Sequence, residues 1–173
     1  MPRSLGNVIA DSLQLSLGYA DRLLEGIAAD RFPRFAAIGG QTVESNHPAF
    51  VYGHLSLYAP KILHQINSPA PQVPEHFEIR FSKDATCVDD QDLDLYPSMD
   101  EIVTFFLEGY RMVTGALRST PDDVFQRPNP AAGRMKDLFP TIGSVQTFYC
   151  GGHMMMHLGQ VSAWRRMEGL GPA

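Results

Sequence analysis

The sequence predicts an all-α protein built as a four-helix bundle. Four segments repeat apolar residues at three- and four-residue steps, which gives each of them one buried helical stripe. No segment of useful length alternates between apolar and polar residues as a half-buried strand would. With 173 residues, 44% of them hydrophobic, the chain suits one domain, residues 1–173, with a sizeable core.

The first two helices have recognisable start signals. The first runs from about Leu5 to Ile27, and the hydroxyl of Ser4 can cap its free N–H groups. The second begins near Asn46-His-Pro48, because proline suits the first helical turn, where its missing N–H costs nothing. Pro60 lies inside this second apolar stripe, so we expect a kink or an early end there.

The last two helices each follow a long connection. Residues 68–97 contain four prolines and form the first connection, in which the run 76–81 is compatible with an extended segment. The third helix opens with the capping box Ser98-Met-Asp-Glu101. After a second connection, residues 127–140, the fourth helix runs from about Ile142 to Met167.

Composition limits the classes of function. The chain has 14 Lys and Arg against 19 Asp and Glu, a net charge of −5, which argues against a nucleic-acid partner. No apolar run has the length of a membrane span, and the N-terminal stretch has no uninterrupted apolar segment that would predict a signal peptide. Cys87 and Cys150 do not make a disulfide framework. We therefore expect a soluble, cytoplasmic protein that does not bind membranes.

Three histidines form the most informative pattern. His153 and His157 are four residues apart, so both project from one face of the fourth helix, at the spacing two imidazoles need to share a metal. His54 lies on the apolar stripe of the second helix and should also point inward. Three imidazoles from two helices would leave a tetrahedral metal with one open position, the pattern of catalytic sites.

Two alternatives remain open at this stage. The histidines can be hydrogen-bonded core residues without a metal, because an H-x-x-x-H pair alone is weak evidence. Cys150 precedes His153 by one turn, and it can be a fourth ligand, a reactive thiol or a small buried residue.

Three segments resemble the DinB-like superfamily, also called the DinB/YfiT-like metalloenzymes. They are Asn46-His-Pro-Ala-Phe-Val-Tyr-Gly-His-Leu55, Pro140-Thr-Ile-Gly143, and His153-Met-Met-Met-His-Leu-Gly-Gln160, of which the last is the most specific. The resemblance implies a bundle with up-down-down-up order and long connections after helices two and three. It also implies that His54, His153 and His157 hold a divalent metal, often nickel or zinc. Imidazole suits iron as well, so iron stays open as a third candidate. Characterised members of this superfamily use low-molecular-weight thiols as cosubstrates, and many form homodimers.

The residues near the three histidines indicate which reaction a metal there would support. Met154 stands where a zincin would place its general-base glutamate, so a zincin peptidase mechanism is unsupported. We expect a metal-dependent enzyme in which water or a low-molecular-weight thiol attacks a small electrophile, as a transferase or a hydrolase. Tyr58, Gln146 and Tyr149 share the helix faces of the histidines and are the candidates to orient the substrate. The alternative is a non-catalytic bundle that binds a metal or senses a ligand.

The aromatic residues of the third helix bear on the oligomeric state. Phe105, Phe106 and Tyr110 point in different directions on a helix, so they cannot all face one core. We therefore expect one of them to lie at the contact of a homodimer.

Overall fold

A computed structural model describes residues 3–173; residues 1 and 2, which begin the stretch inspected for a signal peptide, lie outside the described residues. The chain is mostly helical, which confirms the predicted all-α class, and the part described adds one short two-stranded hairpin. The elements, in chain order, are α1 (Leu5–Leu24), β1 (Ala36–Ile38), β2 (Gln41–Val43), α2 (Pro48–Ser56), α3 (Tyr58–Gln65), α4 (Glu75–Phe81), α5 (Met99–Ser119), α6 (Asp122–Gln126), α7 (Arg134–Leu138), α8 (Ile142–Thr147), the π-helical segment η1 (Phe148–His153) and α9 (Met154–Met167).

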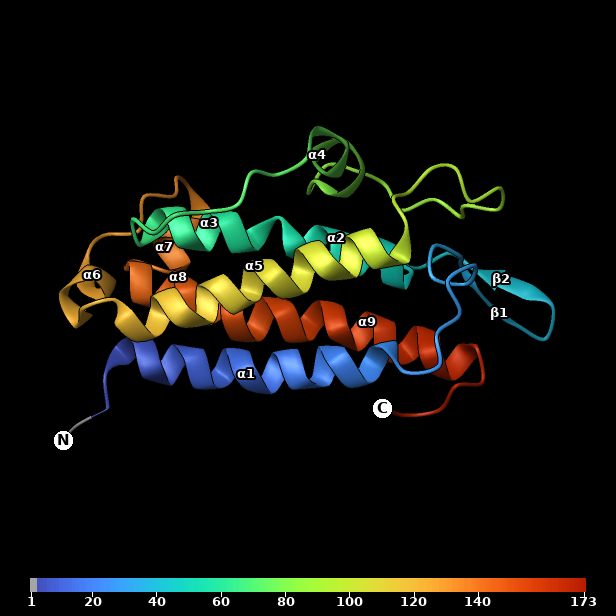
Figure 1. Ribbon diagram of the computed structural model, residues 1–173, viewed down its shortest axis with the longest axis horizontal. Helices are drawn as coiled ribbons and strands as arrows, with labels where there is room; N and C mark the ends of the chain where they lie inside the picture. The colour runs from blue at the N-terminus through green and yellow to red at the C-terminus, as the bar shows by residue number, and fades with distance from the viewer. Residues whose placement is uncertain (1–2) are drawn as a thin grey trace.

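The long helices lie side by side as rods (Figure 1). The rods are α1, the α2–α3 pair, α5, and the continuous run of α8, η1 and α9. Helix α5 packs against α1, α2 and α3, while α9 packs against α1 and α2. Their buried apolar side chains form one hydrophobic cluster, with Leu13, Leu55, Phe106 and Leu158 among its members.

The second predicted helix is divided at Leu57 into α2 and α3. The ring of a proline clashes with the carbonyl group four residues earlier, and here that residue is Ser56, the last residue of α2. The kink or early end expected at Pro60 is thus confirmed.

The connection between α3 and α5 returns along the bundle, and α4 lies across α2 within it (Figure 1). The extended segment considered for residues 76–81 is wrong, because these residues form most of helix α4. Phe77 and Phe81, four residues apart, are both buried, which is a helical and not a strand-like pattern. Gly53 of α2 permits the close approach of α4, since a Cβ there would lie 2.5 Å from the Phe81 ring.

The hairpin of β1 and β2 was not predicted. Its two strands pair antiparallel around Gly39 and Gly40, whose φ angles are 58° and 82°. Two consecutive residues with positive φ are typical of a tight hairpin turn, and glycine adopts them without a steric penalty. Strands of three residues are too short for an alternating pattern to stand out in the sequence.

The fourth predicted helix covers the expected range but is not uniformly α-helical. The segment η1 interrupts it over six residues directly before α9. In a π-helix each N–H donates to the carbonyl five residues earlier, so one turn holds more residues than an α-turn. Side-chain directions deduced from 3.6 residues per turn therefore shift across this segment.

The aromatic residues of α5 find partners inside the chain. Phe106 and Tyr110 are buried in the core, and Phe105 packs edge-on against Phe77 of α4, with 5.0 Å between ring centroids. The reason given for a subunit contact at α5 is therefore removed, while the homodimer itself stays a prediction.

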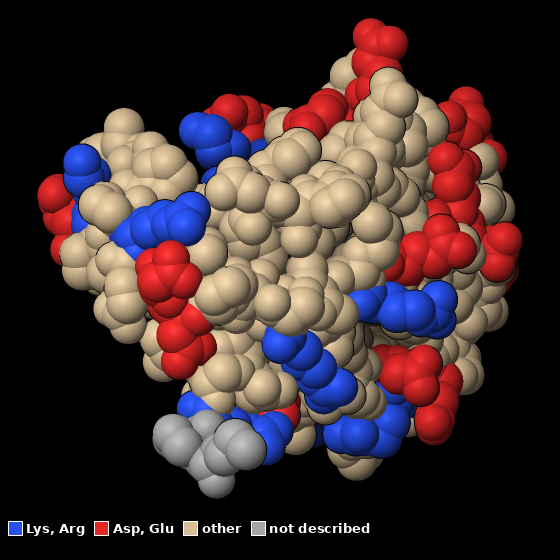
Figure 2. Space-filling model, turned by 60° about the vertical axis from the view of Figure 1, so that its left-hand side comes forward, with Lys and Arg blue, Asp and Glu red and all other residues tan. Residues whose placement is uncertain are grey.

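Charged side chains are mixed on the face shown in Figure 2, where Lys and Arg lie interspersed with Asp and Glu. This face shows no continuous basic surface of the kind that contacts nucleic-acid phosphates. Within residues 3–173, no helix combines the length and apolar character that crossing a membrane requires.

Candidate metal centre

Helix α2 carries His54 in an almost wholly enclosed segment, since all nine of its residues are buried. The helix starts where His47 Nδ1 accepts a hydrogen bond from the N–H of Phe50, at 3.2 Å, with Pro48 in the first turn. His47 Nε2 lies 3.0 Å from the Val88 carbonyl oxygen and donates to it. The N-terminal end of α2 is thereby attached to the long connection, which fixes the helix that presents His54.

The other two histidines lie at the junction of η1 and α9. The run begins with a reciprocal capping box between Thr141 and Ser144. Gly151 lies where the segment crosses α1, because a Cβ there would be 2.9 Å from Ser12 Oγ. His153 is the last residue of η1 and His157 lies one α-helical turn further along α9. π-Helical turns inside α-helices are frequent at functional sites.

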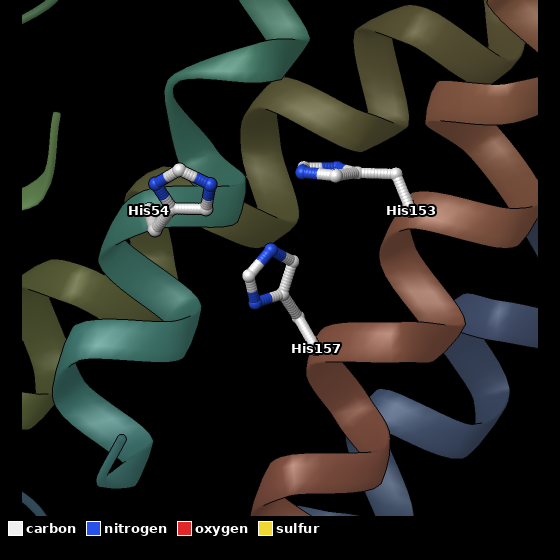
Figure 3. Close-up of side chains that lie close together, drawn as sticks. All are labelled: His54, His153 and His157. Atoms are coloured by element: carbon white, nitrogen blue, oxygen red, sulfur yellow. The ribbon is translucent and has the colours of Figure 1, made fainter. Parts of the chain in front are cut away.

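The three imidazoles converge, as the sequence predicted. One ring nitrogen from each of His54, His153 and His157 lies within 4.8 Å of the others. Figure 3 shows nitrogen atoms of the three rings facing a common space between α2 and α9. Nitrogens that share one tetrahedral ion lie about 3.4 Å apart when each is about 2.1 Å from it. Small side-chain rotations would therefore bring all three onto one ion.

Hydrogen bonds to the outer nitrogens set the orientation of two rings. His54 Nδ1 donates to the Phe81 carbonyl oxygen at 2.9 Å, and His157 Nδ1 donates to Gln160 Oε1 at 3.0 Å. Gln160 Oε1 also accepts from Asn46 Nδ2 at 3.2 Å. With Nδ1 protonated, Nε2 of both rings keeps a free lone pair. This is the tautomer that hydrogen-bond acceptors beside a metal-ligating histidine select.

His153 has one ring nitrogen that the described chain leaves without a hydrogen bond. Its side chain is buried, and its Nδ1 has no hydrogen-bond partner within the described chain. A buried polar atom left without a partner is costly, so such atoms are normally satisfied by a water, an ion or a bound molecule. Three converging imidazoles match the donor set of a nickel, zinc or iron site.

Burial keeps the three rings neutral. It lowers the pKa of His153 to about 3, and the neighbouring charges of His157 and His54 act in the same direction. Burial also lowers the pKa values of His54 and His157, although their hydrogen bonds to Phe81 and Gln160 act against it. Metals bind imidazole in its neutral form, so the site needs no proton release near neutral pH.

Aromatic rings enclose the histidines on several sides. Phe50 is stacked on His54 with 6.3 Å between centroids, and Tyr58 lies 4.3 Å from the ring of His153. Phe148 approaches His153 at 5.5 Å. Apolar walls lower the local dielectric, which strengthens any electrostatic interaction inside the site.

Two cavities open onto the site. A cavity of about 510 Å³ is lined by His54, His157, Phe50, Asn46 and Cys87, among others. A second, of about 620 Å³, lies between α3 and the residues that follow α4, and the two share the lining residues His54, Tyr58, Ser82 and Lys83. Both volumes lie within the range of small-molecule sites.

The three residues proposed to orient a substrate lie at different depths. Tyr58 lines both cavities. Tyr149 contacts Tyr58 at a tilt, with 5.1 Å between ring centroids, and His153 edge-on at 6.0 Å, but it is buried. Gln146 is also buried, and its amide donates to Gln65 Oε1 at 2.7 Å. Of the three, Tyr58 is therefore best placed to touch a molecule in either cavity.

Cys150 does not join the histidines. It is fully buried, and the group of converging ligand atoms contains only the three imidazoles. Burial raises the pKa of its thiol to about 12, which disfavours the nucleophilic thiolate. The shared face with His153 was deduced from α-helical spacing, but both residues lie in η1, where that spacing does not hold.

Several contacts of the site were missed at the level of sequence. The Phe81 carbonyl comes from α4, which was not predicted as a helix. Gln160 was expected on the face of the fourth helix that carries the histidines, but its hydrogen bond to His157, three residues earlier, was not predicted. Lys61 was missed too, and it follows Tyr58 by the same three-residue interval.

Comparison with known proteins adds no assignment. No family model and no curated protein matches this sequence.

Proposed function

We propose that this protein is a metal-dependent enzyme of the DinB-like superfamily. In it, His54, His153 and His157 hold one divalent ion, with nickel or zinc preferred to iron. The observation that carries the proposal is the convergence of three neutral imidazole nitrogens within 4.8 Å at the edge of two cavities. Structural histidines normally satisfy their ring nitrogens with protein partners, whereas His153 Nδ1 has none among the described residues.

A divalent ion in such a site acts as a Lewis acid, which makes water or a thiol a stronger nucleophile near neutral pH. The chain's residues provide the surroundings for that chemistry. Phe81 and Gln160 hold two rings by hydrogen bonds, and Phe50 and Phe148 exclude water beside them. Tyr58 lines both cavities and is placed to contact the electrophile. The proposed reaction is transfer of a low-molecular-weight thiol to a small electrophile, or hydrolysis of that electrophile.

The superfamily assignment rests on the three sequence segments and on the course of the chain. The motif from His153 to Gln160 accounts for two proposed ligands, His153 and His157, and for the residue that orients His157. The connection that carries α4 runs back along the bundle between α3 and α5, as an up-down-down-up order requires (Figure 1). A cytoplasmic location and a homodimer belong to the same proposal.

One observation favours a non-catalytic alternative. The cavity of about 510 Å³ has no Asp or Glu among its lining residues, so no carboxylate is at hand there as a general base. A metal-binding or ligand-sensing bundle would need none. The two functions differ in turnover, which the binding module lacks.

Metal content tests the proposal directly. Protein purified without a His-tag or a nickel column should contain one divalent ion per chain by elemental analysis, and His153→Ala should contain almost none. The matched control is His76→Ala, because His76 is exposed and pairs with Glu101 on the surface. Equal metal in the wild type and in His153→Ala would refute the site.

Turnover then separates the two functions. Small electrophiles should be screened with and without common cellular thiols, using metal-free and metal-loaded protein. An enzyme of the proposed class loses activity on chelation and regains it with added divalent metal. Stoichiometric metal without turnover of any electrophile would favour the binding module.

A further inference from the structure

A lysine is held beside the proposed metal centre by two tyrosine rings. The ammonium nitrogen of Lys61 lies 5.3 Å from the ring centroid of Tyr58 and 5.0 Å from that of Tyr149. The two rings are themselves in contact, with 5.1 Å between centroids. A cation within about 6 Å of an aromatic face is attracted to it, so this pair restrains a side chain that is otherwise flexible.

The same two rings connect the lysine to the histidines. Tyr58 and Tyr149 both contact His153, at 4.3 and 6.0 Å between centroids. Lys61 is thus part of the electrostatic surroundings of the site, on the side of His153.

The ammonium group has no ion-pair partner in residues 3–173. No carboxylate oxygen of that part of the chain lies within 4.0 Å of it. The acidic residues that line the same cavity are Glu78 and Asp84, and Asp84 lies 3.6 Å from Lys83 at a highly exposed position. Lys61 can therefore accept an anionic group without first giving up a salt bridge.

The cavity that contains Lys61 extends to His54, one of the three proposed metal ligands. Lys61, His54 and Tyr58 all line the cavity of about 620 Å³. That volume is enough for a small organic molecule that contacts both ends. A molecule whose reactive end lies near His54 would extend along Tyr58 toward the ammonium group.

We propose that the electrophilic substrate carries a carboxylate and that Lys61 binds it, while the reacting end of the substrate lies at the three histidines. This inference rests on the proposed function, because it names the substrate class of that same site. One ammonium group matches the single charge of a carboxylate, whereas a dianionic phosphate is usually met by more donors. Lys61 is accordingly a specificity-determining residue.

Cobalt(II) is a suitable probe, since its visible spectrum reports ligands that enter the open position. The cobalt-loaded protein should be titrated at physiological salt with succinate and glutarate, and with the monocarboxylates butyrate and pentanoate of equal chain length. One carboxylate of each compound can occupy the metal, and only the dicarboxylates have a second for Lys61. We expect the dicarboxylates to bind at least about tenfold more tightly, the effect of one charge-assisted hydrogen bond.

Variants assign that preference to Lys61. Lys61→Met keeps the apolar stem against the tyrosines and should remove the preference, with the affinities for cobalt and for butyrate unchanged. Lys61→Arg should keep most of it, and Lys136→Met, an exposed lysine of α7, should keep all of it. A preference that survives in Lys61→Met, or a wild type with no preference, would overturn the inference while the metal site stands.

Failure of the metal site gives a different result. If His153→Ala binds cobalt as well as the wild type does, the proposed metal centre is wrong. Calorimetry on the metal-free proteins then tests Lys61 alone, by comparing the glutarate affinity of the wild type with that of Lys61→Met. Weaker binding in Lys61→Met supports the anion site, and equal binding overturns it.

Discussion

Gln160 accepts a hydrogen bond from His157 Nδ1 at 3.0 Å, and the same oxygen accepts a second one from Asn46 at 3.2 Å. The amide therefore connects α9, which carries His157, to the residue that precedes His47 and the start of α2. Its effect on the ring is specific: with Nδ1 protonated, Nε2 is left as the coordinating atom. Gln160 is therefore a positioning residue: it orients His157, and His157 binds the metal.

We predict that Gln160→Leu lowers the affinity for divalent metal by about 10- to 100-fold, the usual effect of removing a partner of a metal-ligating histidine. Isothermal titration calorimetry with zinc measures it. Gln126→Leu is the matched control, because Gln126 is exposed at the end of α6, and it should bind as the wild type does. Equal affinities for all three proteins would show that Gln160 does not orient His157.

The second prediction concerns the approach of α4 to α2. A Cβ on Gly53 would lie 2.5 Å from the ring of Phe81, so Gly53→Ala must displace that ring, and we expect the Phe81 carbonyl group to shift with it. That carbonyl orients His54, hence the variant should lose metal affinity. It should also lose stability, by about 1–3 kcal/mol, as overpacked cores do.

Gly115→Ala is the control for this variant. Gly115 lies on the exposed side of α5 with open space where a Cβ would be, so alanine should raise stability by up to about 1 kcal/mol through helix propensity alone. Urea unfolding and zinc calorimetry measure both variants. Unchanged zinc affinity in Gly53→Ala would mean that the Phe81 carbonyl has no influence on His54.

The site also shows which of its residues could be predicted from the sequence and which could not. The histidines were predictable because helical periodicity alone determines which residues share a face, and η1 lies before His157 and leaves the turn from His153 to His157 α-helical. The Phe81 carbonyl was not predictable. It reaches His54 across 27 residues of chain, through a helix whose position depends on tertiary packing.

The errors in the fold have similar physical causes. Counting 3.6 residues per turn kept a fourth ligand and a reactive thiol open for Cys150, beside the small buried residue that the structure confirms. No residue of the Phe148–His153 segment predicts the π-helical hydrogen bonds that change this count. The extended segment at residues 76–81 was predicted without knowledge of the packing against α2, although Phe77 and Phe81 already have helical spacing. By contrast, the break at Pro60 follows from local sterics and was predicted correctly.

The third prediction is a pH dependence of stability. Burial lowers the pKa of His47 to about 4, although the hydrogen bond to the Val88 carbonyl and the charges of Asp89 and Asp90 act against it. The unfolded chain protonates this histidine near its usual pKa of about 6.5. Between these two values the unfolded state binds more protons, so the free energy of unfolding falls as the pH is lowered through that window.

From pH 7 to pH 5 the contribution of His47 to this loss is about 2 kcal/mol. His47→Asn keeps a residue suited to the helix start but removes the titrating ring. Its stability should therefore fall less than that of the wild type over the same interval, by about that amount, in urea unfolding of the metal-free proteins. His54, His153 and His157 titrate in the same direction in both proteins and cancel in the comparison. Parallel pH profiles would contradict the prediction.

The last prediction is that the thiol of Cys150 is neither a metal ligand nor a nucleophile. Cys150 is buried, its thiol has a pKa of about 12, and it is not among the lining residues of either cavity beside the histidines. Cys150→Ala should therefore retain metal and any metal-dependent turnover, at a cost of about 1–2 kcal/mol for the lost packing. In the folded wild type, iodoacetamide should modify Cys87, which lines a cavity, before Cys150. Mass spectrometry of the alkylated peptides reads the order, and Cys87→Ala isolates the slower site. Loss of metal or turnover in a folded Cys150→Ala protein would move the nucleophile or a ligand onto this cysteine.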